Sequence, residues 1–188
     1  MANIKFKHLI LILFILLPFQ VYSDTHHISA EQSGAFECAE YVIEKTVIVP
    51  EDEKLKFLPG SKLLFNPYAG MNVSGNLVCE GTKENPIIFT SISSPTDSLS
   101  ENYLQWHGVI VNKMGKISFK HCQINNSLYG IKIPDTSSML LFESVSFYKN
   151  DNQLILGEEP VFSGDSTSFS FPIPVKRVPL TRIPLPSE

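Results

Sequence analysis

The sequence predicts an all-β protein in which short strands stack as a repeating coil, and three observations lead to this fold class. Short apolar stretches alternate with Gly, Pro and Asn along most of the chain, which is typical of strands joined by tight corners. Residues 75–91 form the clearest such unit, a strand, a corner and a strand. In addition, six apolar positions within residues 117–133 recur in the same order within residues 140–156. A 23-residue repeat of this kind indicates a solenoid.

Residues 75–91 read Gly-Asn-Leu-Val-Cys-Glu-Gly-Thr-Lys-Glu-Asn-Pro-Ile-Ile-Phe-Thr-Ser. Leu77–Cys79 and Ile87–Phe89 suit pleated strands. Between them, Gly81 can adopt a positive φ and Pro86 fixes its φ near about −65°. The stretch resembles the rung motif of bacterial right-handed parallel β-helix proteins, the secreted pectate-lyase-like modules. The resemblance implies a short single-stranded right-handed parallel β-helix of about four or five rungs, and it implies a fold without a function.

The repeat also predicts which residues lie above one another. Strands in successive turns would stack ~4.8 Å apart, with matching side chains aligned. A sandwich would instead need hairpins, and the usual Asn-Gly and Asp-Gly pairs are missing from the sequence. The aligned pairs are Ile117 with Leu140, Phe119 with Phe142, Cys122 with Val145, Ile124 with Phe147, Ile131 with Leu154 and Ile133 with Leu156.

The chain begins with a predicted secretory signal peptide at residues 1–23. Lys5 and Lys7 precede an apolar run from Leu9 to Leu17, and Ser23 ends a plausible cleavage site. The apolar run is shorter than the ~20 residues that span a bilayer. We therefore expect export to the periplasm, the cell surface or the medium, with no transmembrane helix after cleavage.

Three further segments complete the predicted organisation. Residues 24–45 are expected to cap the first strand edge, because a stack of strands would otherwise end on unpaired backbone. The β-helix is expected over residues 46–159, with an inserted surface loop between Ser91 and Tyr103. Trp106 follows this loop, and we interpret it as a structural core residue. The Pro-rich residues 160–188 predict an extended tail, since frequent Pro excludes a central strand.

The three cysteines would enter an oxidising compartment, which permits one disulfide and leaves one thiol. Cys38 with Cys79 is the candidate pair, although spacing alone does not establish that the two residues come close enough. Cys122 is predicted to be a buried thiol, because it occupies the position of Val145 one repeat later.

Composition argues against nucleic-acid binding. Fifteen Lys and Arg against 19 Asp and Glu give a net charge of −4, and loss of Lys5 and Lys7 with the signal peptide makes it −6. An acidic protein of this kind is a poor partner for a phosphate backbone.

The resemblance raises a catalytic alternative, since many related proteins are polysaccharide lyases or hydrolases. Such sites need acidic clusters with a basic residue, yet the only arginines are Arg177 and Arg182 in the tail. The nearest match to a Gly-His-Gly motif, Trp106-His107-Gly108, has no acidic neighbour. We therefore expect a non-catalytic binding or structural scaffold without a cofactor or metal. The alternative is a small polysaccharide-active enzyme on the same fold.

One stretch is locally basic. Residues 106–134 contain four lysines and no Asp or Glu. This pattern indicates weak, salt-sensitive binding of an anionic glycan or an envelope protein. The alternative is an ordinary solvated surface offset by Glu143, Glu158 and Glu159. The candidate ligand-binding residues are Lys113, Lys116, Lys120, His121, Gln123 and Lys132.

Overall fold

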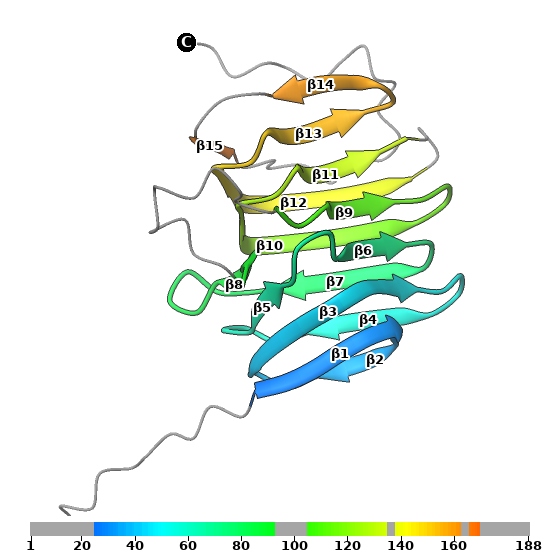
Figure 1. Ribbon diagram of the computed structural model, residues 1–188, viewed down its shortest axis with the longest axis vertical. Helices are drawn as coiled ribbons and strands as arrows, with labels where there is room; N and C mark the ends of the chain where they lie inside the picture. The colour runs from blue at the N-terminus through cyan, green and yellow to red at the C-terminus, as the bar shows by residue number, and fades with distance from the viewer. Residues whose placement is uncertain (1–24, 93–104, 135–137, 163–165, 170–188) are drawn as a thin grey trace, which may run out of the picture.

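A computed structural model describes residues 25–92, 105–134, 138–162 and 166–169. Within these residues the chain forms fifteen strands and no helix, joined in one open sheet. The first thirteen strands pair in parallel, and only β14 and β15 pair antiparallel with their neighbours. In Figure 1 the stack runs from β1 and β2 at one end to β13 and β14 at the other. The all-β prediction is confirmed.

The parallel strands form three stacks of paired strands, which we call ladders 1, 2 and 3. The chain contributes a strand segment to each ladder in turn and then repeats the sequence, and we call each such repeat a pass. Ladder 1 contains β2 (Gly34–Phe36), β4 (Lys54–Phe57), β7 (Asn76–Glu80) and the first halves of β10 (Lys116–Asn125) and β12 (Met139–Tyr148). Ladder 2 contains the first half of β3 (Glu40–Val49), β5 (Lys62–Phe65), β8 (Ile87–Ser91) and the second halves of β10 and β12. Ladder 3 contains the second half of β3, β6 (Gly70–Val73), β9 (Gly108–Val111), β11 (Tyr129–Ile133) and β13 (Asn152–Leu156).

The predicted 23-residue alignment is confirmed at all six positions. Ile117 pairs with Leu140 and Phe119 with Phe142 in ladder 1, while Cys122 pairs with Val145 in ladder 2. The remaining three pairs, Ile124 with Phe147, Ile131 with Leu154 and Ile133 with Leu156, also lie in register. The backbone repeats at the same interval, since positive φ occurs at His121 and again at Ser144, and at Asn126 and again at Lys149.

The core consists of side chains that point inward from all three ladders and stack from pass to pass. Phe89 and Phe119 have ring centroids 5.4 Å apart, and Phe119 and Phe142 are 6.1 Å apart. Trp106 is fully buried and stacks on Phe65 at 3.9 Å. Its indole N–H donates to the carbonyl of Asn125 at 2.8 Å. Trp106 is therefore a structural core residue, as the sequence predicted.

At the corners between ladders the backbones of neighbouring passes lie very close together. Glycine is needed there because a Cβ atom would overlap the adjacent backbone. Gly108 has a φ of 101°, and a Cβ at this position would lie 1.4 Å from the carbonyl oxygen of Tyr129 on the next pass. At Gly75 a Cβ would lie 2.1 Å from the carbonyl oxygen of Pro50. Any side chain at either position would push successive passes apart.

Both ends of the stack are formed by paired strands. Residues 24–45 were expected to form a cap, but β1 (Thr25–Glu31), β2 and the start of β3 join the parallel ladders instead. The buried Ile28 of β1 pairs with Ile43, so a single inward side chain continues the ladder here. At the other end, β14 (Glu159–Phe162) and β15 (Ser166–Phe169) fold back antiparallel onto β13 and β12. The predicted signal peptide, most of the loop after Ser91 and residues 170–188 lie outside the described residues.

All three cysteines are free thiols in the structure. Cys38 is exposed between β2 and β3, whereas Cys79 is buried in β7, so the candidate disulfide between them is not formed. Cys122 is buried as predicted, and its thiol lies 3.3 Å from the carbonyl oxygen of Cys79. Burial raises the pKa of the Cys122 thiol to about 12.

Candidate functional site

The six predicted ligand-binding residues do not share one surface. Lys116 and Lys120 lie on the ladder 1 half of β10, and Gln123 lies on its ladder 2 half. His121 occupies the bend between the two halves, with a φ of 46°. Lys132 belongs to β11 in ladder 3, and Lys113 lies in the corner before β10. The locally basic stretch of the sequence is therefore not one surface of the folded protein, because residues 106–134 run through all three ladders.

Local ion pairs also reduce the charge of the predicted basic stretch. Lys120 lies between Glu80 and Glu143 on neighbouring strands, and its ammonium is 2.8 Å from the Glu143 carboxylate. Lys132 lies over the ring of Tyr129, 5.2 Å from its centroid. An exposed ion pair such as Lys120–Glu143 contributes only ~0–1 kcal/mol to stability, but the carboxylate offsets the charge of Lys120 that a ligand would otherwise meet.

The structure assembles a different basic surface, which we call the lysine face. Among the paired strand residues that the structure describes, ladder 1 presents four outward lysines, whereas ladders 2 and 3 present one each, Lys62 and Lys132. The opposing acids on ladder 1 are Glu80 and Glu143, and Lys56 lies 3.3 Å from the Glu80 carboxylate. Among the paired residues of ladder 1 lysines therefore exceed acids by two, while three acids of the corner before β4 lie beside Lys54. The residues of the lysine face are Lys54, Lys56, Lys116 and Lys120.

Lys54 and Lys116 are the members of the lysine face that carry this excess. Both are exposed, and Asn76 lies between them as the direct neighbour of each in the ladder. Two strand spacings therefore separate the two backbones, roughly 10 Å. Two ammonium groups at this spacing can contact successive anionic groups of one extended ligand.

A groove of about 390 Å³ borders this pair of lysines. It results from the lengths of three successive corners between ladder 3 and ladder 1. Residues 50–53 precede β4, only Ser74 and Gly75 precede β7, and residues 112–115 precede β10. The short middle corner is recessed between the two longer ones. Backbone bonds fix this arrangement, with the amide of Asn76 donating to Glu53 and that of Lys116 donating to Gly75, both at 2.8 Å.

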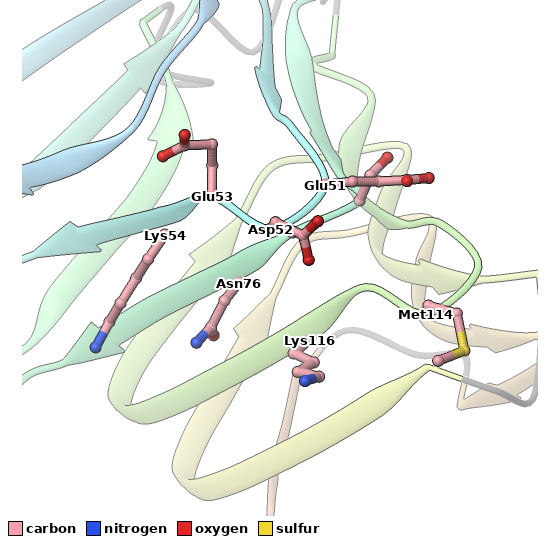
Figure 2. Close-up of a pocket in the computed structure, with 9 residues that line it drawn as sticks. Glu51, Asp52, Glu53, Lys54, Asn76, Met114 and Lys116 are labelled. Carbon is pink, nitrogen blue, oxygen red and sulfur yellow. The ribbon is translucent and has the colours of Figure 1, made fainter.

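The groove carries both signs of charge. Figure 2 shows the acidic side chains of the corner before β4, with Lys54, Asn76 and Lys116 on the strands beside them. The three acids are Glu51, Asp52 and Glu53. They would repel an anionic ligand from the corner and confine it to the outward side of ladder 1.

Two further properties concern metal ions and membranes. Among the described residues, no group of three or more His, Cys, Asp and Glu side chains is placed to hold a metal ion. The part of the chain that the structure describes contains no helix long and apolar enough to cross a membrane.

Comparison with known proteins yields no relative. No family model, no curated protein and no solved structure matches this chain.

Sequence reasoning identified Lys116 and Lys120 but missed Lys54 and Lys56. In ladder 1, Lys54 pairs with Asn76, and Asn76 pairs with Lys116 after a much longer step along the chain. The longer step contains the segment that follows Ser91, which breaks the regular repeat. Only the pairing of β7 with both β4 and β10 brings the four lysines onto one face.

Proposed function

We propose that this protein is a right-handed parallel β-helix that acts outside the cytoplasm as a non-catalytic scaffold, and that its lysine face binds an anionic glycan. Parallel pairing in three ladders, with a 23-residue register between β10 and β12 and between β11 and β13, supports the β-helix. The signal-peptide pattern of residues 1–23 supports export. The observation that carries the binding proposal is the four outward lysines on ladder 1.

The charges of this face suit a polymer better than a small ion. Each exposed lysine is screened by salt within ~8–10 Å, so a single contact would be weak. Lys54 and Lys116 lie on strands two spacings apart, and a polymer with regularly spaced carboxylate or sulfate groups can contact both at once. Binding of this type gains from several weak contacts and is lost as salt rises.

Chromatography of the purified protein on immobilised dextran sulfate at low salt tests the proposal. We expect retention that ends at moderate salt. The variant Lys54→Gln/Lys116→Gln should elute at much lower salt, because it loses the excess charge of the face. The matched control is Lys45→Gln/Lys132→Gln, which removes the same charge from β3 and β11, outside the lysine face and its groove.

Equal elution of the two double variants would contradict the proposal, since net charge alone would then explain retention. Failure of the parent protein to bind would contradict it as well.

A further variant should strengthen retention instead of weakening it. Glu51→Gln/Glu53→Gln should elute at higher salt than the parent, because it removes repulsive charge beside Lys54.

The proposal includes the absence of glycan cleavage. Incubation with pectin, alginate or chondroitin, with and without Ca²⁺, should release neither unsaturated sugar ends nor new reducing ends. Sustained turnover by the purified protein would instead establish the alternative, a small polysaccharide-active enzyme on the same fold.

A further inference from the structure

Three aromatic residues lie on neighbouring passes at the corner that leads into ladder 3, and the rings of two of them are in contact. Tyr68, His107 and Tyr129 come from three successive passes. The amide of His107 donates to the carbonyl of Ala69 at 2.7 Å, and the amide of Tyr129 donates to the carbonyl of His107 at 3.2 Å. The rings of Tyr68 and His107 are 5.9 Å apart and inclined at 66°. We call these three residues the aromatic corner.

Tyr68 is strained as well as exposed. Its φ is 63°, a region that bulky side chains rarely adopt, and the residue is 59% exposed. No other Tyr or Phe among the described residues has a positive φ. Burial of the ring does not offset the strain, because most of the residue faces solvent. Strained residues are found frequently at ligand sites.

Polar groups with balanced charge surround the rings. Gln105, two residues before His107, donates from its amide to the Asp151 carboxylate at 2.8 Å. On the other side, the Lys132 ammonium lies 5.2 Å from the centroid of the Tyr129 ring. One carboxylate and one ammonium leave no net charge at this corner. It therefore offers aromatic surface with hydrogen-bonding groups at its edges.

We propose that the aromatic corner binds the ring face of an uncharged saccharide, with Tyr68 as the main contact. The C–H groups of a pyranose ring pack favourably on an aromatic face, which is apolar and electron-rich. Sugar hydroxyls can bond to the Gln105 amide and the Asp151 carboxylate. This site goes beyond the proposed function, because it lies on a different part of the molecule from the lysine face and needs no charge on the ligand.

Titration of the purified protein with cellotriose, chitotriose and maltotriose tests the proposal by NMR of labelled tyrosine rings. We expect at least one of these sugars to shift the ring signals of Tyr68 and Tyr129 in a saturable manner. The shifts should persist at 0.5 M salt (about 4 Å screening length), whereas retention on dextran sulfate should not.

Three variants give the test its specificity. Tyr68→Asn should weaken binding at least tenfold without lowering the thermal midpoint, because Asn tolerates a positive φ. Tyr68→Phe keeps the ring and should bind within a factor of three of the parent. The matched control is Tyr148→Asn, which removes a tyrosine of similar exposure, 48%, from β12.

Several results would overturn the inference. They are the absence of saturable shifts with all three sugars, equal shifts of Tyr148 and Tyr68, and unchanged binding by Tyr68→Asn. Tyr68→Asn should leave retention on dextran sulfate unaltered, and Lys54→Gln/Lys116→Gln should leave saccharide binding unaltered. Failure of the aromatic corner can therefore be distinguished from failure of the lysine face.

Discussion

On β10, Ile117 and Phe119 point into the core, whereas Lys116 and Lys120 point outward from the same strand. Phe119 lies between the rings of Phe89 and Phe142, so its size is constrained by passes on both sides. Lys120 also has neighbours on both sides, but they are exposed acids that tolerate substitution. Inward residues of this fold therefore determine which strands stack, and outward residues remain available for binding.

The largest expected effect on stability comes from the close backbone contact between Gly108 and Tyr129, because it sets the spacing of neighbouring strands for inward and outward side chains alike. Gly108→Ala should destabilise the protein by more than about 4 kcal/mol, because the new methyl group would overlap the Tyr129 carbonyl at a φ of 101°. Urea denaturation followed by far-UV circular dichroism measures this effect. A midpoint close to that of the parent would show that passes are not in such close contact.

Inward aromatic residues should give the next largest effect. Phe119→Ala and Phe142→Ala should each cost ~3–5 kcal/mol, because each leaves a cavity in a stack of aligned rings. Denaturant midpoints measure the loss. If either variant unfolded at the parent's midpoint, the inward side would be no more constrained than the outward side.

Cys122 permits a milder test of the inward side. Its partner one pass later is Val145, so Cys122→Val should fit and should change stability at neutral pH by less than ~1.5 kcal/mol. The folded pKa of Cys122 is raised to about 12 by burial, from an ordinary value of 9.0. Stability should therefore be fully present below pH 9 and should fall as the pH rises towards 12, because only the unfolded thiol ionises there.

The measurement for Cys122 is the urea midpoint of parent and variant between pH 8 and pH 11 (a window set by the thiol pKa values). The variant should lose less stability than the parent over this range. Thiol labelling provides a second readout, in which Cys38 reacts in the native protein while Cys79 and Cys122 react only after unfolding. Rapid native labelling of Cys122 would be inconsistent with its burial.

Outward substitutions should have the smallest effect on folding. Lys120→Gln removes an exposed ion pair with Glu143 and should change stability by no more than ~1 kcal/mol. Thermal midpoints of the variant and the parent measure the change. A loss comparable to that of Phe119→Ala would remove the distinction between the two sides of β10.

The sequence predicts the buried side chains well, because apolar side chains of similar volume must recur at the same interval for successive passes to stack. The six aligned pairs and the buried Cys122 follow from this constraint. The groups of exposed side chains are predicted poorly, because they depend on which strands pair and these strands are unevenly spaced along the sequence. Lys54 and Lys116 are far apart in the chain, as are Tyr68 and His107, and neither separation is a multiple of the repeat.

Edge strands are a second class of feature that the sequence pattern does not reveal. β1 and β2 were interpreted as a cap because His26, His27 and several small polar residues interrupt the apolar pattern. In the structure Ile28 is buried and pairs with Ile43, while the polar neighbours stay exposed. One inward residue per strand is sufficient to continue the ladder at an end of the stack, where one side has no further core to fill.

The central claim is that buried side chains 23 residues apart contact each other. A double-mutant cycle between Phe119 and Phe142 tests this claim most directly. Their rings are 6.1 Å apart. Aromatic pairs typically couple by ~0.5–1.5 kcal/mol beyond their burial. We therefore predict that the double alanine variant loses less stability than the sum of the two single variants, by about that amount. In the control cycle between Phe119 and Val49, which lie in ladders 1 and 3, the effects should add within ~0.5 kcal/mol. Additive effects in the Phe119–Phe142 cycle would contradict the register on which the account depends.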